Sequence, residues 1–172
     1  MKYLPSLLLF SILAAFYSCG KNQTLSVVNY EMTLKKNGVS ETLDPYYCAI
    51  QPNTVTPSET DFFLSARSQD NRVNFSIAIQ VNGSFVPGTY ETNNGSGNYP
   101  VIADYFLDQG QPGERDYTID NAPNSASGYF TVTITSIDDN VVKGTFSGNY
   151  LYDGIYNESI VVTDGSFIAK RH

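Results

Sequence analysis

Alternation of apolar and polar side chains is the feature that most restricts the fold of this chain. In Val73–Val81 every odd position carries a large apolar residue and every even position a small or polar one. Phe130–Thr135 repeats the pattern with three threonines. A period of two is that of a strand with one buried face, and no stretch of helical length shows a 3.6-residue period. The sequence therefore predicts an all-β fold.

Turn dipeptides separate these alternating runs. Asn-Gly and Asp-Gly accept the positive φ angles of tight hairpin turns, which favours an antiparallel meander over βαβ units. We expect a β-sandwich or a partly open barrel of roughly nine or ten strands, with a closed lipocalin-like barrel as the alternative. The dipeptides are Asn37-Gly38, Asn82-Gly83, Asn94-Gly95, Asp153-Gly154 and Asp164-Gly165.

The runs between the turns define the expected strands, and the break in alternation at Ser136-Ile137 predicts a β-bulge. Polar loops are expected at 91–98, 108–116 and 120–127. The expected strands are Val27–Lys36, Tyr46–Ile50, Asp61–Ser68, Val73–Val81, Tyr99–Leu107, Tyr129–Ile137, Val141–Tyr152, Ile155–Val162 and Ser166–Arg171.

The N-terminus has the three parts of an export signal. Lys2 supplies a positive charge, an apolar run extends from Leu4 to Tyr17, and the small residue Ser18 precedes Cys19. The apolar run is shorter than the roughly 20 residues that a transmembrane helix needs. We therefore expect a signal peptide at 1–18, a short tether at 19–26 and a single domain at 27–172.

The segment Phe16-Tyr17-Ser18-Cys19 resembles a lipobox, in the aromatic form found in Bacteroidota lipoproteins. The resemblance implies that Cys19 becomes the first residue of the mature chain and carries acyl chains such as palmitate. Two or three chains give stable membrane anchoring, whereas one chain alone gives only marginal binding. Gly20 is not an inner-membrane retention aspartate, so we expect the outer membrane, with the periplasmic face favoured over the cell surface.

The second cysteine, Cys48, leaves an alternative open. A Cys19–Cys48 disulfide is possible in an exported domain. Cys48 lies in a strand-like stretch, however, where a free thiol behaves as a small buried hydrophobe. We expect a lipid on Cys19 and an unpaired Cys48.

Charge and residue types restrict the chemistry. The chain has 17 acidic and 10 basic residues, a net charge of −7, which argues against nucleic-acid partners. The single histidine is the terminal His172, where fraying is common, so neither a catalytic triad nor a histidine-rich metal site is expected. No cofactor motif occurs.

Carboxylates are the remaining catalytic candidates. They gather in one loop-rich region, where a glycosidase would need two at a fixed separation and Ca²⁺ would need several oxygen ligands. We interpret them as solubilising loop residues, and expect no catalytic or metal site. The candidates are Asp104, Asp108, Glu114, Asp116 and Asp120.

Short motifs in the second half resemble a pattern of small Bacteroidota lipoproteins with all-β domains. Val142–Gly148 contains a Gly-Thr-Phe strand, Ile160–Phe167 ends in Gly-x-Phe, and Pro87–Tyr90 contains Gly-Thr-Tyr. The resemblance implies an all-β lipoprotein and assigns no catalytic residue.

The expected function is a non-catalytic binding or interaction module of the cell envelope, held at the membrane by Cys19. A glycan or an envelope protein would meet its loops or its tyrosine-bearing faces, because tyrosine combines a flat apolar ring with a polar tip. A lipocalin-like carrier of an apolar ligand is the alternative, and a carboxylate-based glycosidase is the third hypothesis.

Overall fold

The structure is a computed structural model that describes residues 28–92, 101–119 and 129–172. The expected signal peptide, Cys19, the tether, Asn94-Gly95 and Asp120 lie outside these residues. Ten strands and no helix are present in the described part. The strands are β1 (Glu31–Lys36), β2 (Val39–Pro52), β3 (Glu59–Arg67), β4 (Val73–Asn82), β5 (Gly88–Glu91), β6 (Val101–Leu107), β7 (Arg115–Ile119), β8 (Phe130–Ile137), β9 (Val141–Asp153) and β10 (Glu158–Lys170).

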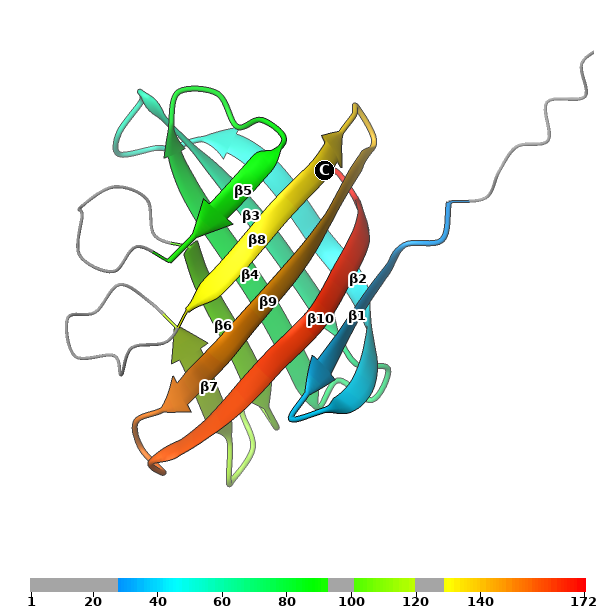
Figure 1. Cartoon of the computed structure of the whole chain (residues 1–172), viewed down its shortest axis with the longest axis vertical. Coiled ribbons are helices and arrows are strands. Elements are labelled where there is room, and N and C mark those ends of the chain that lie inside the picture. Colours follow the sequence, from blue (N-terminus) through cyan, green and yellow to red (C-terminus); the bar gives the residue numbers. More distant parts are fainter. Residues whose placement is uncertain (1–27, 93–100, 120–128) are drawn as a thin grey trace, which may run out of the picture.

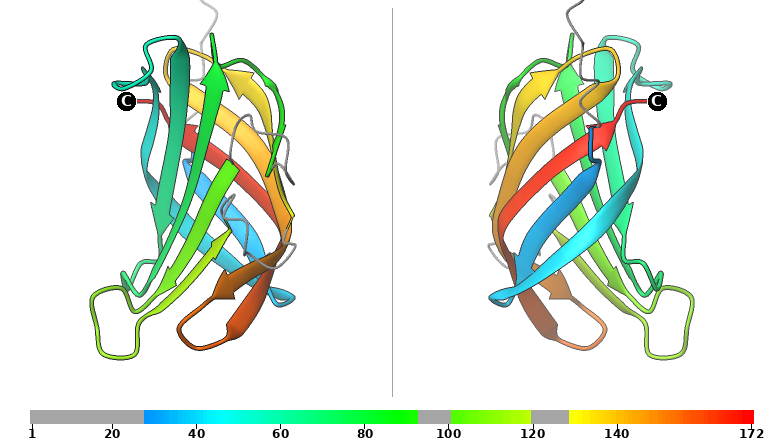
Figure 2. Two further views of the ribbon diagram at one scale, coloured as in Figure 1. Left: turned by 90° about the vertical axis from the view of Figure 1, so that its left-hand side faces the viewer. Right: turned by 90° about the vertical axis from the view of Figure 1, so that its right-hand side faces the viewer.

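All ten strands belong to one antiparallel sheet that curls around a core (Figures 1 and 2). The order is β10-β1-β2-β3-β4-β6-β7-β9-β8-β5, and β9 also pairs with β10. The pairing between β7 and β9 has a single registered pair, Thr118 and Tyr152. The result is a partly open barrel, which confirms the predicted all-β antiparallel architecture.

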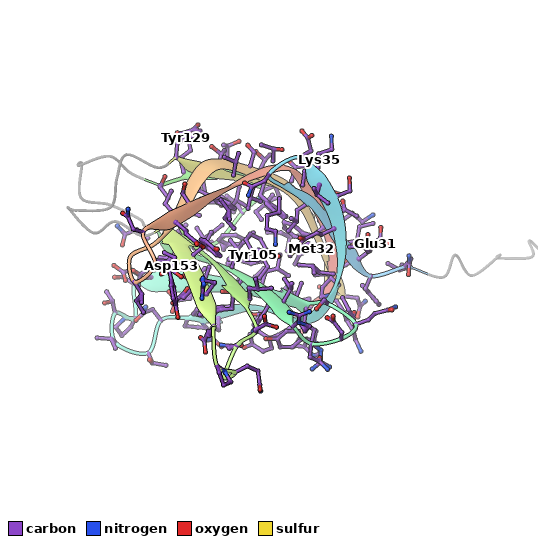
Figure 3. All side chains as sticks on the ribbon, turned by 90° about the horizontal axis from the view of Figure 1, so that it is seen from below. Glu31, Met32, Lys35, Tyr105, Tyr129 and Asp153 are labelled. Carbon is purple, nitrogen blue, oxygen red and sulfur yellow. The ribbon has the colours of Figure 1, made fainter. Side chains whose placement is uncertain are left out.

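The alternation seen in the sequence separates the inner from the outer side of the barrel. Met32 on β1 and Tyr105 on β6 point inward, whereas Glu31 and Lys35 point outward (Figure 3). Aromatic rings fill much of the interior, with the ring centroids of Phe75 and Phe146 5.2 Å apart. A filled interior of this kind does not favour the lipocalin-like alternative, which needs space for a ligand.

Three cross-strand pairs explain the Gly-Thr-Phe and Gly-x-Phe motifs. Phe167 lies opposite Gly144, Phe146 opposite Gly165, and Phe130 opposite Gly148. A Cβ atom added to Gly165 would lie 2.3 Å from Cε2 of Phe146, and one added to Gly148 would lie 2.3 Å from Cδ2 of Phe130. Each glycine therefore provides the space that a neighbouring phenylalanine ring occupies. These motifs are structural.

The Gly-Thr-Tyr motif also has a structural role. The Tyr90 hydroxyl donates a hydrogen bond to the Val86 carbonyl oxygen, and its ring stacks on Phe85 with centroids 5.0 Å apart. Phe85 in turn stacks on Phe62, with centroids 4.9 Å apart. This stack joins the β4–β5 connection to the core.

One predicted hairpin is wrong. A turn was expected near Asp164-Gly165, but β10 continues through both residues to Lys170. Asp164 adopts a φ of 51°, and the register with β9 shifts between Val162 and Gly165. The dipeptide thus accommodates a β-bulge within one long strand, because positive φ serves a bulge as well as a turn. The expected strands Ile155–Val162 and Ser166–Arg171 are one strand.

Other local predictions are confirmed. Asn37 and Gly38 have φ angles of 50° and 83°, which fit a tight hairpin turn between β1 and β2. The bulge predicted at Ser136-Ile137 is present as a register shift between Ile134 and Ser136. The short strands β5 and β7 were not predicted.

Candidate functional site

A β-bulge in β2 places two adjacent tyrosines on the outer side of the barrel. The register between β2 and β3 shifts between Pro45 and Tyr47. Pro45 and Cys48 are buried, whereas Tyr46 and Tyr47 are 42% and 39% exposed. A regular strand would turn one of the two rings inward, so the bulge is what exposes both.

Neighbouring side chains hold the two rings in position. The Arg67 guanidinium lies over the Tyr46 ring, 5.2 Å from its centroid. The Asn74 amide donates hydrogen bonds to the Tyr46 hydroxyl at 3.4 Å and to the Gln109 side-chain oxygen at 3.1 Å. We refer to the outer surface around Tyr46, Tyr47, Arg67, Asn74 and His172 as the tyrosine face.

The C-terminus is part of this face, which corrects the expectation of a frayed end. The His172 ring stacks on Tyr47, with centroids 6.1 Å apart and 9° between the planes. The His172 N–H donates to the Cys48 carbonyl oxygen at 2.9 Å, and the Arg171 N–H donates to the Asn140 carbonyl oxygen at 2.8 Å. Backbone hydrogen bonds therefore also fix the two residues that follow β10.

Two cross-strand rows of outward side chains continue the tyrosine face from β2 over β3, β4 and β6, and the polar row extends to β7. The polar row is Tyr47, Ser65, Ser76, Asp104 and Thr118. The apolar row is Ala49, Phe63, Ala78 and Ile102. Polar and apolar groups thus lie side by side on one outer surface.

Such a surface combines the two kinds of group that a sugar chain contacts. The C–H faces of a pyranose ring pack on tyrosine rings, while its hydroxyls need polar partners. Asp104 accepts hydrogen bonds from Thr118 at 2.6 Å and from Ser76 at 3.4 Å, so its carboxylate is held on this surface.

Two hollows in the described surface lie elsewhere. One, of about 670 Å³, borders the start of β1 and the β3–β4 turn and includes Glu31, Asp44 and Asp70. Another, of about 410 Å³, is lined mainly by Thr131, Thr133, Thr145, Ser147 and Ser166. Neither includes Tyr46 or Tyr47. The tyrosine face therefore lies outside both hollows, on the outer side of the barrel.

The structure pairs Asp108 with a basic partner but keeps three of the other candidate carboxylates, Asp104, Glu114 and Asp116, within electrostatic range of one another. Asp108 forms a bidentate pair with Arg72 at 2.6 and 2.9 Å, which lowers the pKa of Asp108. The Glu114 carboxylate accepts a hydrogen bond from the Gly110 N–H at 2.7 Å. Asp104 and Asp116 share the outer side of β6 and β7. Desolvation, with the charges of Asp104 and nearby acids, raises the pKa of Asp116.

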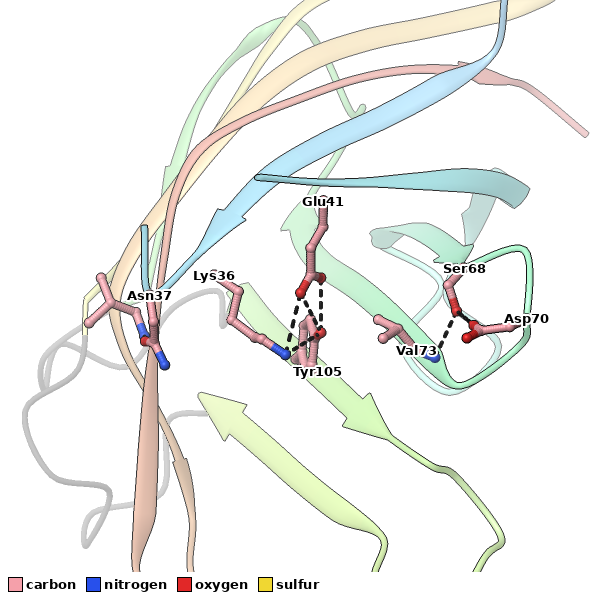
Figure 4. A network of polar contacts seen from close by, with 8 residues as sticks. Lys36, Asn37, Glu41, Ser68, Asp70, Val73 and Tyr105 are labelled. Atoms are coloured by element: carbon pink, nitrogen blue, oxygen red, sulfur yellow. Dashed lines mark hydrogen bonds and ion pairs between the residues drawn. The ribbon is translucent and has the colours of Figure 1, made fainter. Parts of the chain in front are cut away.

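A polar network closes the interior near the β1–β2 turn. The Tyr105 hydroxyl donates to Glu41 Oε2 at 2.9 Å and accepts from Lys36 Nζ at 2.9 Å (Figure 4). Lys36 and Glu41 form an ion pair at 3.3 Å. Burial and the Glu41 charge raise the pKa of Tyr105, so the phenol stays protonated and acts as a structural donor.

Cys48 is buried and free, as the sequence predicted. Desolvation raises the pKa of its thiol to about 12. Within the described part of the chain, His, Cys, Asp and Glu side chains do not gather in threes in a way that could hold a metal ion.

Sequence reasoning missed Tyr46, Tyr47 and His172 as site residues. A period of two would turn one of the two adjacent tyrosines inward, so the alternation pattern carries no signal that both rings face outward.

Comparison with protein-family models, with characterised proteins and with solved structures finds no match to this chain. The described residues include no helix of the length and apolar character required to cross a membrane.

Proposed function

We propose that this protein is a lipid-anchored, non-catalytic module of the cell envelope that binds a glycan chain on its tyrosine face. The observation that carries the binding proposal is the outward exposure of both Tyr46 and Tyr47 at the β2 bulge. The anchor rests on the N-terminal sequence, where the signal-like run ends at Cys19.

The proposed location in the cell indicates which glycan is bound. At the periplasmic face of the outer membrane, the abundant polymer within reach of a tethered domain is peptidoglycan. Binding to a polymer also removes the need for high affinity at one site, because many domains anchored in one membrane engage one polymer together. A site on the open outer surface of the barrel is therefore sufficient for binding the polymer.

The test is co-sedimentation of the detergent-solubilised full-length protein with purified peptidoglycan sacculi. Tyr46→Ala and Tyr47→Ala each remove one stacking surface, and we expect each to weaken binding by about 10-fold, a loss of roughly 1.4 kcal/mol. Tyr129→Ala is the matched control, because Tyr129 is also exposed but lies immediately before β8, outside the tyrosine face.

Unchanged sedimentation of a Tyr46→Ala, Tyr47→Ala double variant would refute the glycan site. Equal losses in the Tyr129→Ala control would also refute it, since binding would then not depend on this face. Thermal unfolding of each variant establishes that the fold is intact.

A further inference from the structure

The turn between β9 and β10 differs in character from the β3–β4 and β6–β7 turns at the same end of the barrel. It exposes Ile155, at 85%, and the neighbouring Tyr156. The β3–β4 turn at 68–72 and the β6–β7 turn at 108–114 are polar. An isolated exposed apolar residue needs no explanation, but two adjacent ones on a single turn require a closer look at how the turn is held.

The buried carboxylate of Asp153 fixes the backbone of this turn. Its Oδ1 accepts hydrogen bonds from the N–H groups of Ile155 at 2.8 Å and Tyr156 at 3.1 Å. Its Oδ2 accepts from the Asp116 N–H on β7 at 3.2 Å. One side chain therefore joins the turn to the neighbouring strand.

A second set of contacts fixes the Tyr156 ring. The Arg115 guanidinium lies 3.3 Å from the Tyr156 ring centroid, and its Nε is 3.4 Å from Glu158 Oε2. The same Glu158 oxygen accepts a hydrogen bond from the Tyr117 hydroxyl at 3.0 Å. The turn thus presents Ile155 beside an aromatic ring that is already ordered before any partner arrives.

Acidic side chains surround the turn. Glu114, Asp116 and Glu158 lie on the adjacent β7 and β10 segments, and Arg115 is the basic group that offsets them. Desolvation, with the charges of Asp104, Asp153 and Glu114, raises the pKa of Asp116. A partner that covers Ile155 must therefore also meet negative charge.

We propose that the β9–β10 turn is a preorganised docking tip for a protein partner that has an apolar pocket bordered by lysine or arginine. Ile155 fills the pocket, and the surrounding carboxylates face the basic rim. Because the turn is ordered in advance, little conformational entropy is lost on binding.

The charge around the tip argues against two other occupants. Anionic lipid headgroups would be repelled by the carboxylates. A second copy of this chain would bring the same acidic surface against itself, which is unfavourable.

The test uses the full-length, membrane-borne protein with a photo-crosslinking amino acid in place of Ile155. Val55 is the matched control position, because it is 88% exposed on the β2–β3 turn, away from the tip. We expect one discrete protein adduct at position 155 and none at position 55. Purified wild-type protein should compete the adduct away, whereas the Ile155→Ser protein should not.

The adduct then provides a purified partner for binding measurements. Ile155→Ser should weaken the binding of the partner by about 10- to 100-fold, because one large aliphatic side chain is no longer buried in the complex. Asp116→Asn should slow association and reduce its salt dependence. Equal crosslinking at positions 155 and 55 would overturn the proposal, as would equal competition by the Ile155→Ser protein, or an adduct only with lipid or a second copy.

Discussion

The substitution Gly165→Ala tests whether Gly165 is required to make room for the Phe146 ring. In Gly165→Ala, the new Cβ would lie 2.3, 2.4 and 2.5 Å from the Cε2, Cδ2 and Cζ atoms of Phe146. Carbon atoms in contact prefer separations of about 3.5–4.0 Å, so the ring must move by about 1 Å. Its neighbours restrict that movement, because the Phe75 and Phe130 centroids lie 5.2 and 5.9 Å away.

Overpacking of a well-filled core costs about 1–3 kcal/mol. We expect Gly165→Ala to reach the upper part of that range, about 2–3 kcal/mol. For a chain of this size, each kcal/mol lowers the unfolding temperature by roughly 2–4 °C, which gives a decrease of about 4–12 °C. Urea unfolding of the purified protein measures the free energy directly.

Gly88→Ala on the edge strand β5 is the matched control. A Cβ at Gly88 would meet no atom within 4 Å, so the free energy of unfolding should change by less than about 1 kcal/mol. Combining Gly165→Ala with Phe146→Leu should cost less than the sum of the two single changes, because a smaller side chain relieves the clash. If Gly165→Ala is no more destabilising than Gly88→Ala, the explanation of the glycine motifs is wrong.

Three other changes test the polar contacts and the buried thiol. Tyr105→Phe should lower the free energy of unfolding by about 1–2 kcal/mol in urea titrations, because Lys36 and Glu41 each lose a hydrogen-bond partner. Asp153→Ala should cost about 2–3 kcal/mol by the same measurement, with partial recovery in Asp153→Asn, because three N–H groups lose their acceptor. The raised pKa of Cys48 means that, between pH 9 and 12, its thiol ionises in the unfolded chain but not in the native one. The free energy of unfolding should therefore fall with pH in this interval, and Cys48→Ala should reduce the slope by up to about 1.4 kcal/mol per pH unit.

The alternating runs were sufficient to predict most of the core strands, but β2 extends over Val39–Pro52, well beyond the expected Tyr46–Ile50. In Val73–Val81 the odd positions from Phe75 onward are buried, as period two requires. The same rule could not find β5 and β7, because strands of four and five residues are too short to show a period. At Asp164 the sequence correctly indicates a positive φ. It did not distinguish a hairpin turn from a β-bulge, because both accept the same φ.

The tyrosine face could not be predicted for a related reason. Its formation depends on a register shift between β2 and β3, which is a property of strand pairing rather than of either strand alone. The terminal His172 joins it only because β10 brings the chain end beside β2. The carboxylates, conversely, are close in sequence but face different partners, because Asp108 is at a turn and Asp104 is on a strand.

The proposed location at the membrane depends on the lipid anchor. Intact-mass measurement of the membrane-extracted protein tests this anchor most directly. We expect a chain that begins at Cys19 and carries the added mass of two or three acyl chains, together with a Cys19→Ser variant that lacks the added mass. A wild-type chain with an unmodified Cys19 would contradict the account, and the domain would then not be held at a membrane by lipid.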